Sequence, residues 1–168
     1  MRPGTRQHPG FTLVEVLVVI LIIGIIINFA TLSLGNGGPG EQLKTEARRL
    51  TSLIELAAEE AQLKSVPIGV AIGDSNYRFL RRDGDRWVES DASVFRERKL
   101  PEGMHLKLIA ERRAVEAEGE QRLPDILLFS SGEMSPFELD VSSDLADDDR
   151  FRITGDETGT LALQHVTP

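Results

Sequence analysis

The chain has 168 residues, enough for one globular domain with or without an appended segment. Its formal net charge of −8 argues against binding to the phosphate backbone of nucleic acids, because such binding needs a basic surface. The sequence has no cysteine, which excludes disulfides, thiolate metal sites, cysteine nucleophiles and a lipidated cysteine.

The first predicted element is an apolar helix over residues 11–34, in which Glu15 is the only charged residue. A helix over this range would be about 36 Å long, which is enough to cross a bilayer core of about 30 Å. Arg2 and Arg6 precede the helix, whereas no basic residue follows it before Lys44. The positive-inside rule therefore places the N-terminus in the cytoplasm and the rest of the chain outside.

Three simpler interpretations of this segment remain open. A cleaved secretory signal could use Ala30 and Ser33 as a weak cleavage site. A plain signal anchor would have no role beyond holding the chain at the membrane. A buried helix of a soluble domain is disfavoured, because no later part of the chain is apolar enough to enclose it.

Glu15 favours a more specialised interpretation. A carboxylate within a membrane segment costs on the order of 2.5–3.5 kcal/mol at the helix centre and usually marks a function. Phe11 lies four residues before Glu15 and directly follows Gly10. A cut between Gly10 and Phe11 would create an amino group that could offset the carboxylate, in the same helix or in a neighbouring one. In the second arrangement the pair would set the axial stagger between packed subunits, so we expect Glu15 to act in assembly.

The string GFTLVE, from Gly10 to Glu15, closely resembles the type IV prepilin signature. That signature is a short basic leader ending in Gly, then Phe, then Glu at the fifth mature position, within a long apolar run. The resemblance implies that residues 1–10 are a leader and that a prepilin peptidase cleaves after Gly10 and methylates the amine of Phe11. The chain would then be a substrate of that enzyme.

Residues 35–40, with the sequence GNGGPG, interrupt the helical pattern. Glycine and proline are unfavourable in the interior of a helix, so the segment is either a simple linker or a flexible joint between anchor and domain. The residues of this predicted hinge are Gly35, Gly37, Gly38, Pro39 and Gly40.

A second helix is predicted over residues 41–64, because apolar residues recur at alternating spacings of four and three. The apolar stripe consists of Leu43, Ala47, Leu50, Ile54, Ala57 and Ala61. The charged residues placed on other faces are Glu46, Arg49, Glu55, Glu59 and Glu60. We expect the stripe to pack on a sheet of the same domain, with a partner helix as the alternative.

After Pro67 the chain consists of short β-like segments separated by turn residues. Asp83, Gly84 and Asp85 have the chemistry of a tight hairpin turn. The predicted strands cover residues 68–72, 77–81, 86–89, 94–98, 105–110, 126–130, 137–141, 151–154 and 160–166. Residues 111–122 are dense in charge and are interpreted as an exposed hairpin loop or short helix. The predicted fold class is α+β, with the amphipathic helix packed on antiparallel β-sheet.

Three strings in this half resemble a known family. The passage EARRLTSLIELAAEEAQLKSVPIGVAI, followed by NYRFL, resembles the helix-to-first-strand region of type II secretion system protein H, a minor pseudopilin. The strings ILLFSSGEMSPFELDV and FRITGDETGTLAL resemble the two closing blocks of that family and of related minor pilins of the type IV pilus.

Side chains with catalytic or metal-binding chemistry are scattered. His8, His105 and His165 have no second ligand at helix or strand spacing, and no cofactor or catalytic residue is expected. The one candidate metal site is a weak calcium site formed by Asp144, Asp147, Asp148 and Asp149. Calcium prefers several oxygen ligands on a flexible loop. Four acidic residues in a loop are more often simply solvated.

The resemblance implies a pilin-like protein with four parts: a leader over residues 1–10, a transmembrane and filament-core helix over 11–34, a joint over 35–40 and a periplasmic domain over 41–168. It implies a non-enzymatic subunit of the inner membrane that later lies near the tip of a periplasmic pseudopilus and supports protein export. The implied partners are the major pseudopilin, the other minor pseudopilins, the prepilin peptidase and the inner-membrane assembly platform. The alternatives are a minor pilin of a type IV or DNA-uptake pilus and, from another class, a signal-anchored envelope enzyme.

Overall fold

The structure is a computed structural model that describes residues 13–34, 38–109, 123–146 and 149–167, with only the backbone described over residues 26–34. The chain divides into two compact units, Met1–Gly38 and Pro39–Pro168.

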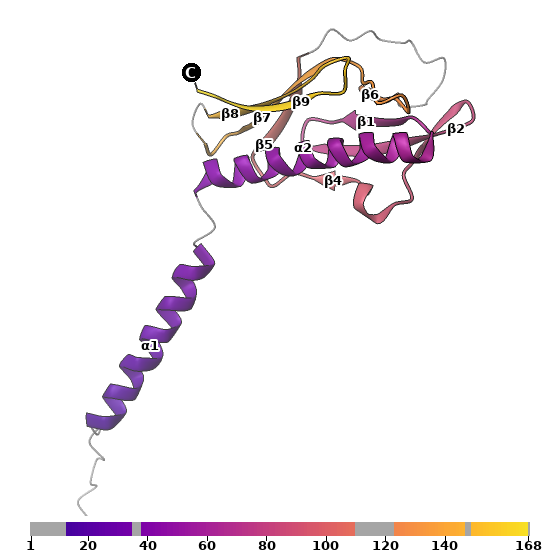
Figure 1. Cartoon of the computed structure of the whole chain (residues 1–168). Coiled ribbons are helices and arrows are strands. Elements are labelled where there is room, and N and C mark those ends of the chain that lie inside the picture. The colour runs from indigo at the N-terminus through magenta and orange to yellow at the C-terminus, as the bar shows by residue number, and fades with distance from the viewer. Residues whose placement is uncertain (1–12, 35–37, 110–122, 147–148, 168) are drawn as a thin grey trace, which may run out of the picture. The chain divides into compact units, whose positions relative to one another are not determined.

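In the described part of the first unit, helix α1 (Leu13–Leu34) lies within the predicted range (Figure 1). Its apolar side chains are open to the surroundings: Leu13 is 81 % exposed and Ile20 is 64 % exposed. Among the described residues, no helix combines the length and the hydropathy that a membrane crossing requires. Phe11 and Thr12, which the sequence assigned to the same segment, lie outside the described residues.

The second unit begins with helix α2 (Pro39–Lys64), which starts two residues earlier than predicted. Proline is well tolerated at the first helical position, because the N–H that it lacks would have no partner there. Pro39 and Gly40 therefore belong to the helix and not to a non-helical joint, which corrects part of the predicted hinge. Of the remaining hinge residues, Gly38 precedes the helix, and Gly35 and Gly37 lie outside the described residues.

The strands among the other described residues of this unit form two antiparallel sheets. The first, sheet A, has the order β3-β2-β1-β6, and β4 also pairs with β2; the second, sheet B, has the order β5-β7-β8-β9. Sheet A consists of β1 (Ile68–Ile72), β2 (Asn76–Asp83), β3 (Arg86–Glu89), β4 (Arg98–Lys99) and β6 (Ile126–Leu128). Sheet B consists of β5 (Met104–Leu108), β7 (Phe137–Ser143), β8 (Arg150–Gly155) and β9 (Leu161–Val166).

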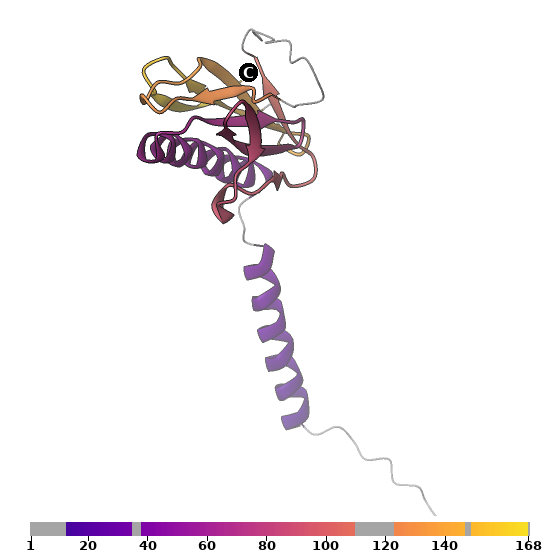
Figure 2. The ribbon, with the colours of Figure 1, turned by 90° about the vertical axis from the view of Figure 1, so that its right-hand side faces the viewer.

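Helix α2 runs alongside the strands and contacts both sheets (Figure 1 and Figure 2). All six residues of the predicted apolar stripe are at most 1 % exposed, which confirms packing within the same domain. They share one core with Val70 and Phe79 of sheet A and with Leu139 and Ile153 of sheet B. The fold is therefore α+β, as predicted.

The predicted hairpin at Gly84 is present, because Asp83 pairs with Arg86 and Gly84 has a φ of 57°. The predicted strand over residues 94–98 is wrong. A short 3-10 helix, η1 (Ser93–Phe95), occupies its first part, and β4 contains only Arg98 and Lys99. One aromatic side chain anchors the segment in the core: Phe95 is 1 % exposed, and its ring centroid lies 5.0 Å from that of Phe79. Most of the predicted loop over residues 111–122 lies outside the described residues.

Candidate functional site

The N-terminal unit carries the residues that the sequence linked to processing and assembly. Gly10 and Phe11 lie outside the described residues, whereas Glu15 lies in the first turn of α1. A carboxylate there is favourable, because the first turn of a helix has a partial positive charge. The apolar side chains around it, such as Val16, Leu17 and Val18, are 44–60 % exposed. A helix that is apolar on all faces is stable only when lipid or other helices cover it.

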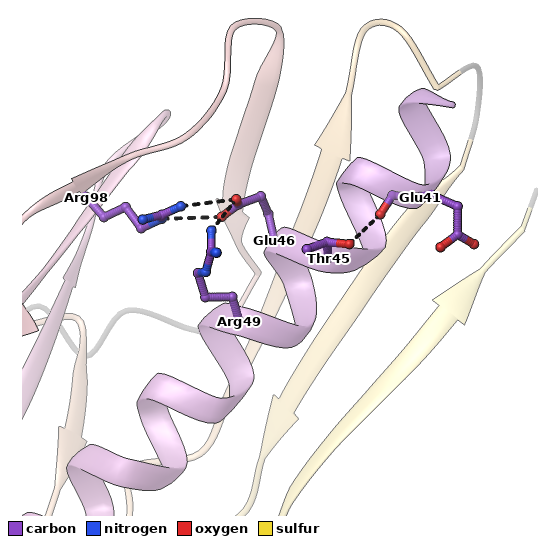
Figure 3. Close-up of polar contacts among 5 residues, drawn as sticks. All are labelled: Glu41, Thr45, Glu46, Arg49 and Arg98. Carbon is purple, nitrogen blue, oxygen red and sulfur yellow. Dashed lines mark hydrogen bonds and ion pairs between the residues drawn. The ribbon is translucent and has the colours of Figure 1, made fainter. Parts of the chain in front are cut away.

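In the second unit, Glu46 of α2 is the centre of a polar cluster (Figure 3). Its side chain is 9 % exposed, and its Oε1 accepts hydrogen bonds from Arg49 Nη1 at 2.7 Å and from Arg98 Nη2 at 3.2 Å. The Nε of Arg98 donates to the second carboxylate oxygen at 3.4 Å. The hydrogen bond to Glu46 raises the pKa of Arg98. The cluster thereby ties the two-residue strand β4 to the helix.

Tyr77 adjoins this cluster, because it pairs with Arg98 in the register of β2 and β4. The residue is 1 % exposed, and burial raises the pKa of its hydroxyl to about 12. Its Oη has no hydrogen-bond partner among the described residues. Buried polar groups are usually paired, so the buried Tyr77 hydroxyl lowers the stability of the domain.

On sheet B, Asp140 of β7 and Arg152 of β8 form a bidentate pair. Arg152 Nε and Nη2 donate to the two carboxylate oxygens at 2.7 and 3.0 Å, and Nη1 donates to Glu138 at 3.2 Å. Asp140 is 6 % exposed, and its hydrogen bonds raise the pKa of Arg152. Asp140 and Arg152 lie directly opposite each other in the register, so the pair joins adjacent strands.

Two histidines contact aspartates that are distant in the sequence. The ring nitrogens of His105 lie 3.2 Å from Asp144 Oδ2 and 3.2 Å from Asp74 Oδ2. These two carboxylates, that of Asp144 first, raise the pKa of His105. His165 stacks on Phe151 with a centroid distance of 4.7 Å. Its Nε2 lies 3.2 Å from Asp149 Oδ1.

These contacts involve two residues of the weak calcium candidate. Asp144 and Asp149 contact different histidines, and Asp147 and Asp148 lie outside the described residues. Within the described part of the chain, no group of three or more His, Cys, Asp or Glu side chains could hold a metal ion.

Sequence reasoning missed the burial of Glu46 and the aspartate partners of His105. Glu46 lies directly before Ala47 and three residues after Leu43, so a helical wheel places it at the border of the apolar stripe. That border position could have indicated that Glu46 is partly buried. The contact of His105 with Asp74 and Asp144 had no local signal, because it depends on how β5, β7 and the β1–β2 turn are brought together.

Comparisons with known proteins agree with this architecture. The prokaryotic N-terminal methylation motif matches residues 5–27, and the family of type II transport protein GspH matches residues 46–159. Type II secretion system protein H of Pseudomonas aeruginosa is 35 % identical over 145 residues, covering 80 % of this chain and 83 % of that protein. The protein of the same name from Aeromonas hydrophila is 29 % identical and covers 94 % of this chain and 95 % of its own.

Solved structures give the same result. The minor pseudopilin EpsH from the type 2 secretion system of Vibrio cholerae superposes with a TM-score of 0.61 at 27 % identity, covering 73 % of this chain and 96 % of that one. The solution structure of Escherichia coli GspH has a TM-score of 0.58 at 19 % identity, with 77 % and 92 % covered, and it supports the fold alone. The GspH match spans more than half of the chain, and the chain therefore belongs to the family of type II secretion system protein H, the minor pseudopilins H.

Proposed function

We propose that this minor pseudopilin is a non-catalytic structural subunit, anchored in the inner membrane and later placed near the tip of a periplasmic pseudopilus. One observation carries the proposal: the methylation motif over residues 5–27 and the GspH match over residues 46–159 lie in the same chain and in that order. In this role the chain supports export of folded proteins across the outer membrane.

Processing by a prepilin peptidase is the first step. The matched motif includes Gly10, Phe11 and Glu15, so cleavage after Gly10 would leave an N-methylated Phe11 four residues before the carboxylate. A cation at that position offsets the cost of a carboxylate in an apolar environment.

The exposed apolar side chains of α1 support two successive environments for this helix. Lipid covers them while the subunit is in the inner membrane, with the N-terminus cytoplasmic and the domain Pro39–Pro168 periplasmic. Helices of the major pseudopilin and of the other minor pseudopilins cover them once the inner-membrane assembly platform has moved the subunit into the filament. The Glu15 carboxylate would then meet the amine of a neighbouring subunit.

The polar clusters of the domain have a structural role. Glu46 with Arg98 and Asp140 with Arg152 are ion pairs that join a helix to a strand and a strand to a strand. Their cations and carboxylates already bond one another, so we assign them to holding the domain together.

The N-terminus of the protein purified from membranes tests the processing step. Mass spectrometry should find a chain that starts with N-methylated Phe11. A chain that retains Met1, or that was cut near Ser33, would contradict processing by a prepilin peptidase.

Deletion of the gene tests the machine to which the subunit belongs. Export by the type II system should stop, and expression of the intact chain should restore it, while type IV pili and DNA uptake remain unchanged. Loss of pili with normal export would instead support the minor-pilin alternative.

A further inference from the structure

Strand β9 has one edge that pairs with β8, and no described strand pairs with its other edge. The strand, yellow in Figure 1, is at the rim of sheet B. An open edge presents unpaired N–H and C=O groups to any extended chain, so proteins usually protect such edges.

The other edges of the two sheets carry recognisable protection. β5 has an exposed lysine, Lys107, and β3 begins with Arg86 and ends with Glu89. β4 has only two residues and β6 only three. β9 differs from all of these, because its six residues, LALQHV, include no lysine, arginine, acidic residue or proline. Its open edge is suited to accept another strand.

A depression lies beside this edge, on the flank of α2. It has a volume of about 190 Å³ and is lined by Glu55, Ala58, Glu59 and Gln62 of the helix, by Gly132 and Gly159, and by Leu161 of β9. Gly159 lies so close to the Gly132 carbonyl that a Cβ would collide with it. The backbones of two turns thus meet at the depression.

The lining is acidic. Glu55 and Glu59 are exposed, and neither forms an ion pair with another of the described residues. Leu161 and Leu163 are half-buried and face the core side of the sheet, opposite Gly155 and Ile153. A strand added at about 4.8 Å from β9 would place its inward side chains beside these leucines and over the depression.

We propose that the open edge of β9 receives an extended segment of another pseudopilin, and that a lysine or arginine of this segment lies in the depression against Glu55 and Glu59. The inference rests on the proposed assembly with other pseudopilins. Main-chain hydrogen bonds along β9 hold the segment, and the basic side chain sets its register.

A second copy of this chain fits the edge poorly. The inward residues that its own β9 would bring are Leu161, Leu163 and His165, none of which has the permanent positive charge that Glu55 and Glu59 would attract. Each copy also has a formal net charge of −8, so two copies repel each other. A pair of two β9 edges is therefore disfavoured, and we take the occupant to be a different subunit with a basic strand.

Photo-crosslinking of the full chain, expressed with its secretion system, tests this arrangement. The crosslinking residue p-benzoylphenylalanine replaces Gln164 on β9, and a matched variant carries it at Lys107 on β5, the opposite edge of the same sheet. Irradiation should join position 164 to an extended, lysine- or arginine-containing segment of another pseudopilin, identified by mass spectrometry, and should leave position 107 without that adduct.

Charge reversal provides the second measurement. Glu55→Lys with Glu59→Lys should lower the adduct yield at position 164 about fivefold, because a charge-assisted contact becomes a repulsion. Asp83→Lys with Asp85→Lys, on the β2–β3 hairpin, changes the net charge equally and should leave the yield unchanged. Equal losses in the two double variants would overturn the role of Glu55 and Glu59.

A third crosslinking position, Val18 of α1, separates this inference from the proposed function. Adducts with pseudopilins at position 18 but none at position 164 would reject the β9 site and retain the assembly role. No adduct at either position would reject both. An adduct between position 164 and a second copy of this chain, or with a helical surface, would also overturn the proposal.

Discussion

Glu46 and Arg98 are 52 residues apart in the sequence, yet Nε and Nη2 of Arg98 both donate hydrogen bonds to the Glu46 carboxylate. The carboxylate is buried, whereas Arg98 and Arg49 are 38 % and 44 % exposed at their side chains. Solvent therefore screens the cations but not the anion, and the pair contributes less than a fully buried one would. Its main effect is to fix β4 and the preceding segment on α2.

Removal of the carboxylate should destabilise the domain. Glu46→Ala leaves two guanidinium groups without their acceptor and should lower the free energy of unfolding by about 1–2 kcal/mol. Urea unfolding of the full chain in detergent measures the change. Glu60→Ala, which removes the more exposed pair with Lys64, is the matched control and should cost about 0.5 kcal/mol or less. Equal effects of the two substitutions would show that burial of Glu46 adds nothing.

The Tyr77 hydroxyl should prove dispensable. Its Oη is buried without a described partner, so Tyr77→Phe removes an unsatisfied polar group and keeps the ring that packs edge-on against Phe79 at 6.1 Å. Stability should stay the same or rise by up to about 1 kcal/mol. Tyr77→Ala, which also removes the ring, should cost about 3–5 kcal/mol by analogy with other large aromatic truncations in cores. A marked loss of stability in Tyr77→Phe would mean that the hydroxyl has a partner after all.

Local patterns predicted those parts of the fold that local forces determine. The apolar stripe of α2 depends on helical periodicity alone, and β1 and β3 are bounded by Pro67, Gly73 and the Gly84 turn, so their predicted ranges match the structure. The strand predicted around Phe95 is wrong, because β-branched and aromatic composition cannot distinguish a strand from a short turn whose aromatic ring is buried. Gly10 and Phe11 stay predictions, since they lie outside the described residues.

The polar part of the candidate site was less accessible to sequence reasoning. The contacts of Glu46 with Arg98 and of His105 with Asp74 and Asp144 join elements that only the chain topology brings together. The exposure of a charged residue at the border of an apolar stripe depends on which strand or loop packs beside it, and the helix sequence does not give that. Such pairs could be named only once the two sheets were placed around α2.

The stability contribution of His105 should depend on pH. Asp144 and Asp74 raise the pKa of His105 in the folded state, so the protonated form is favoured by folding. This contribution is fully present below the unfolded pKa of about 6.5 and disappears as the pH rises through the higher folded pKa. In urea unfolding of the full chain, His105→Gln should therefore lower the midpoint urea concentration near pH 6. The same substitution should have little effect on this midpoint near pH 9. In a background with Asp74→Asn and Asp144→Asn, the substitution should have the same effect at both pH values.

Glu15 should matter for assembly and not for membrane insertion. Glu15→Ala makes α1 more apolar, so fractionation should still find the chain in the inner membrane. Incorporation into pseudopili should fall roughly tenfold or more, because losing about 1.4 kcal/mol of contact with a neighbour's amine changes an equilibrium by that factor. Glu15→Gln tests whether the charge or the hydrogen-bonding group is needed, and Val18→Ala in the same helix controls for loss of side-chain volume. Quantifying the chain in sheared pseudopili gives the comparison, and wild-type incorporation of Glu15→Ala would show that the carboxylate has no part in subunit packing.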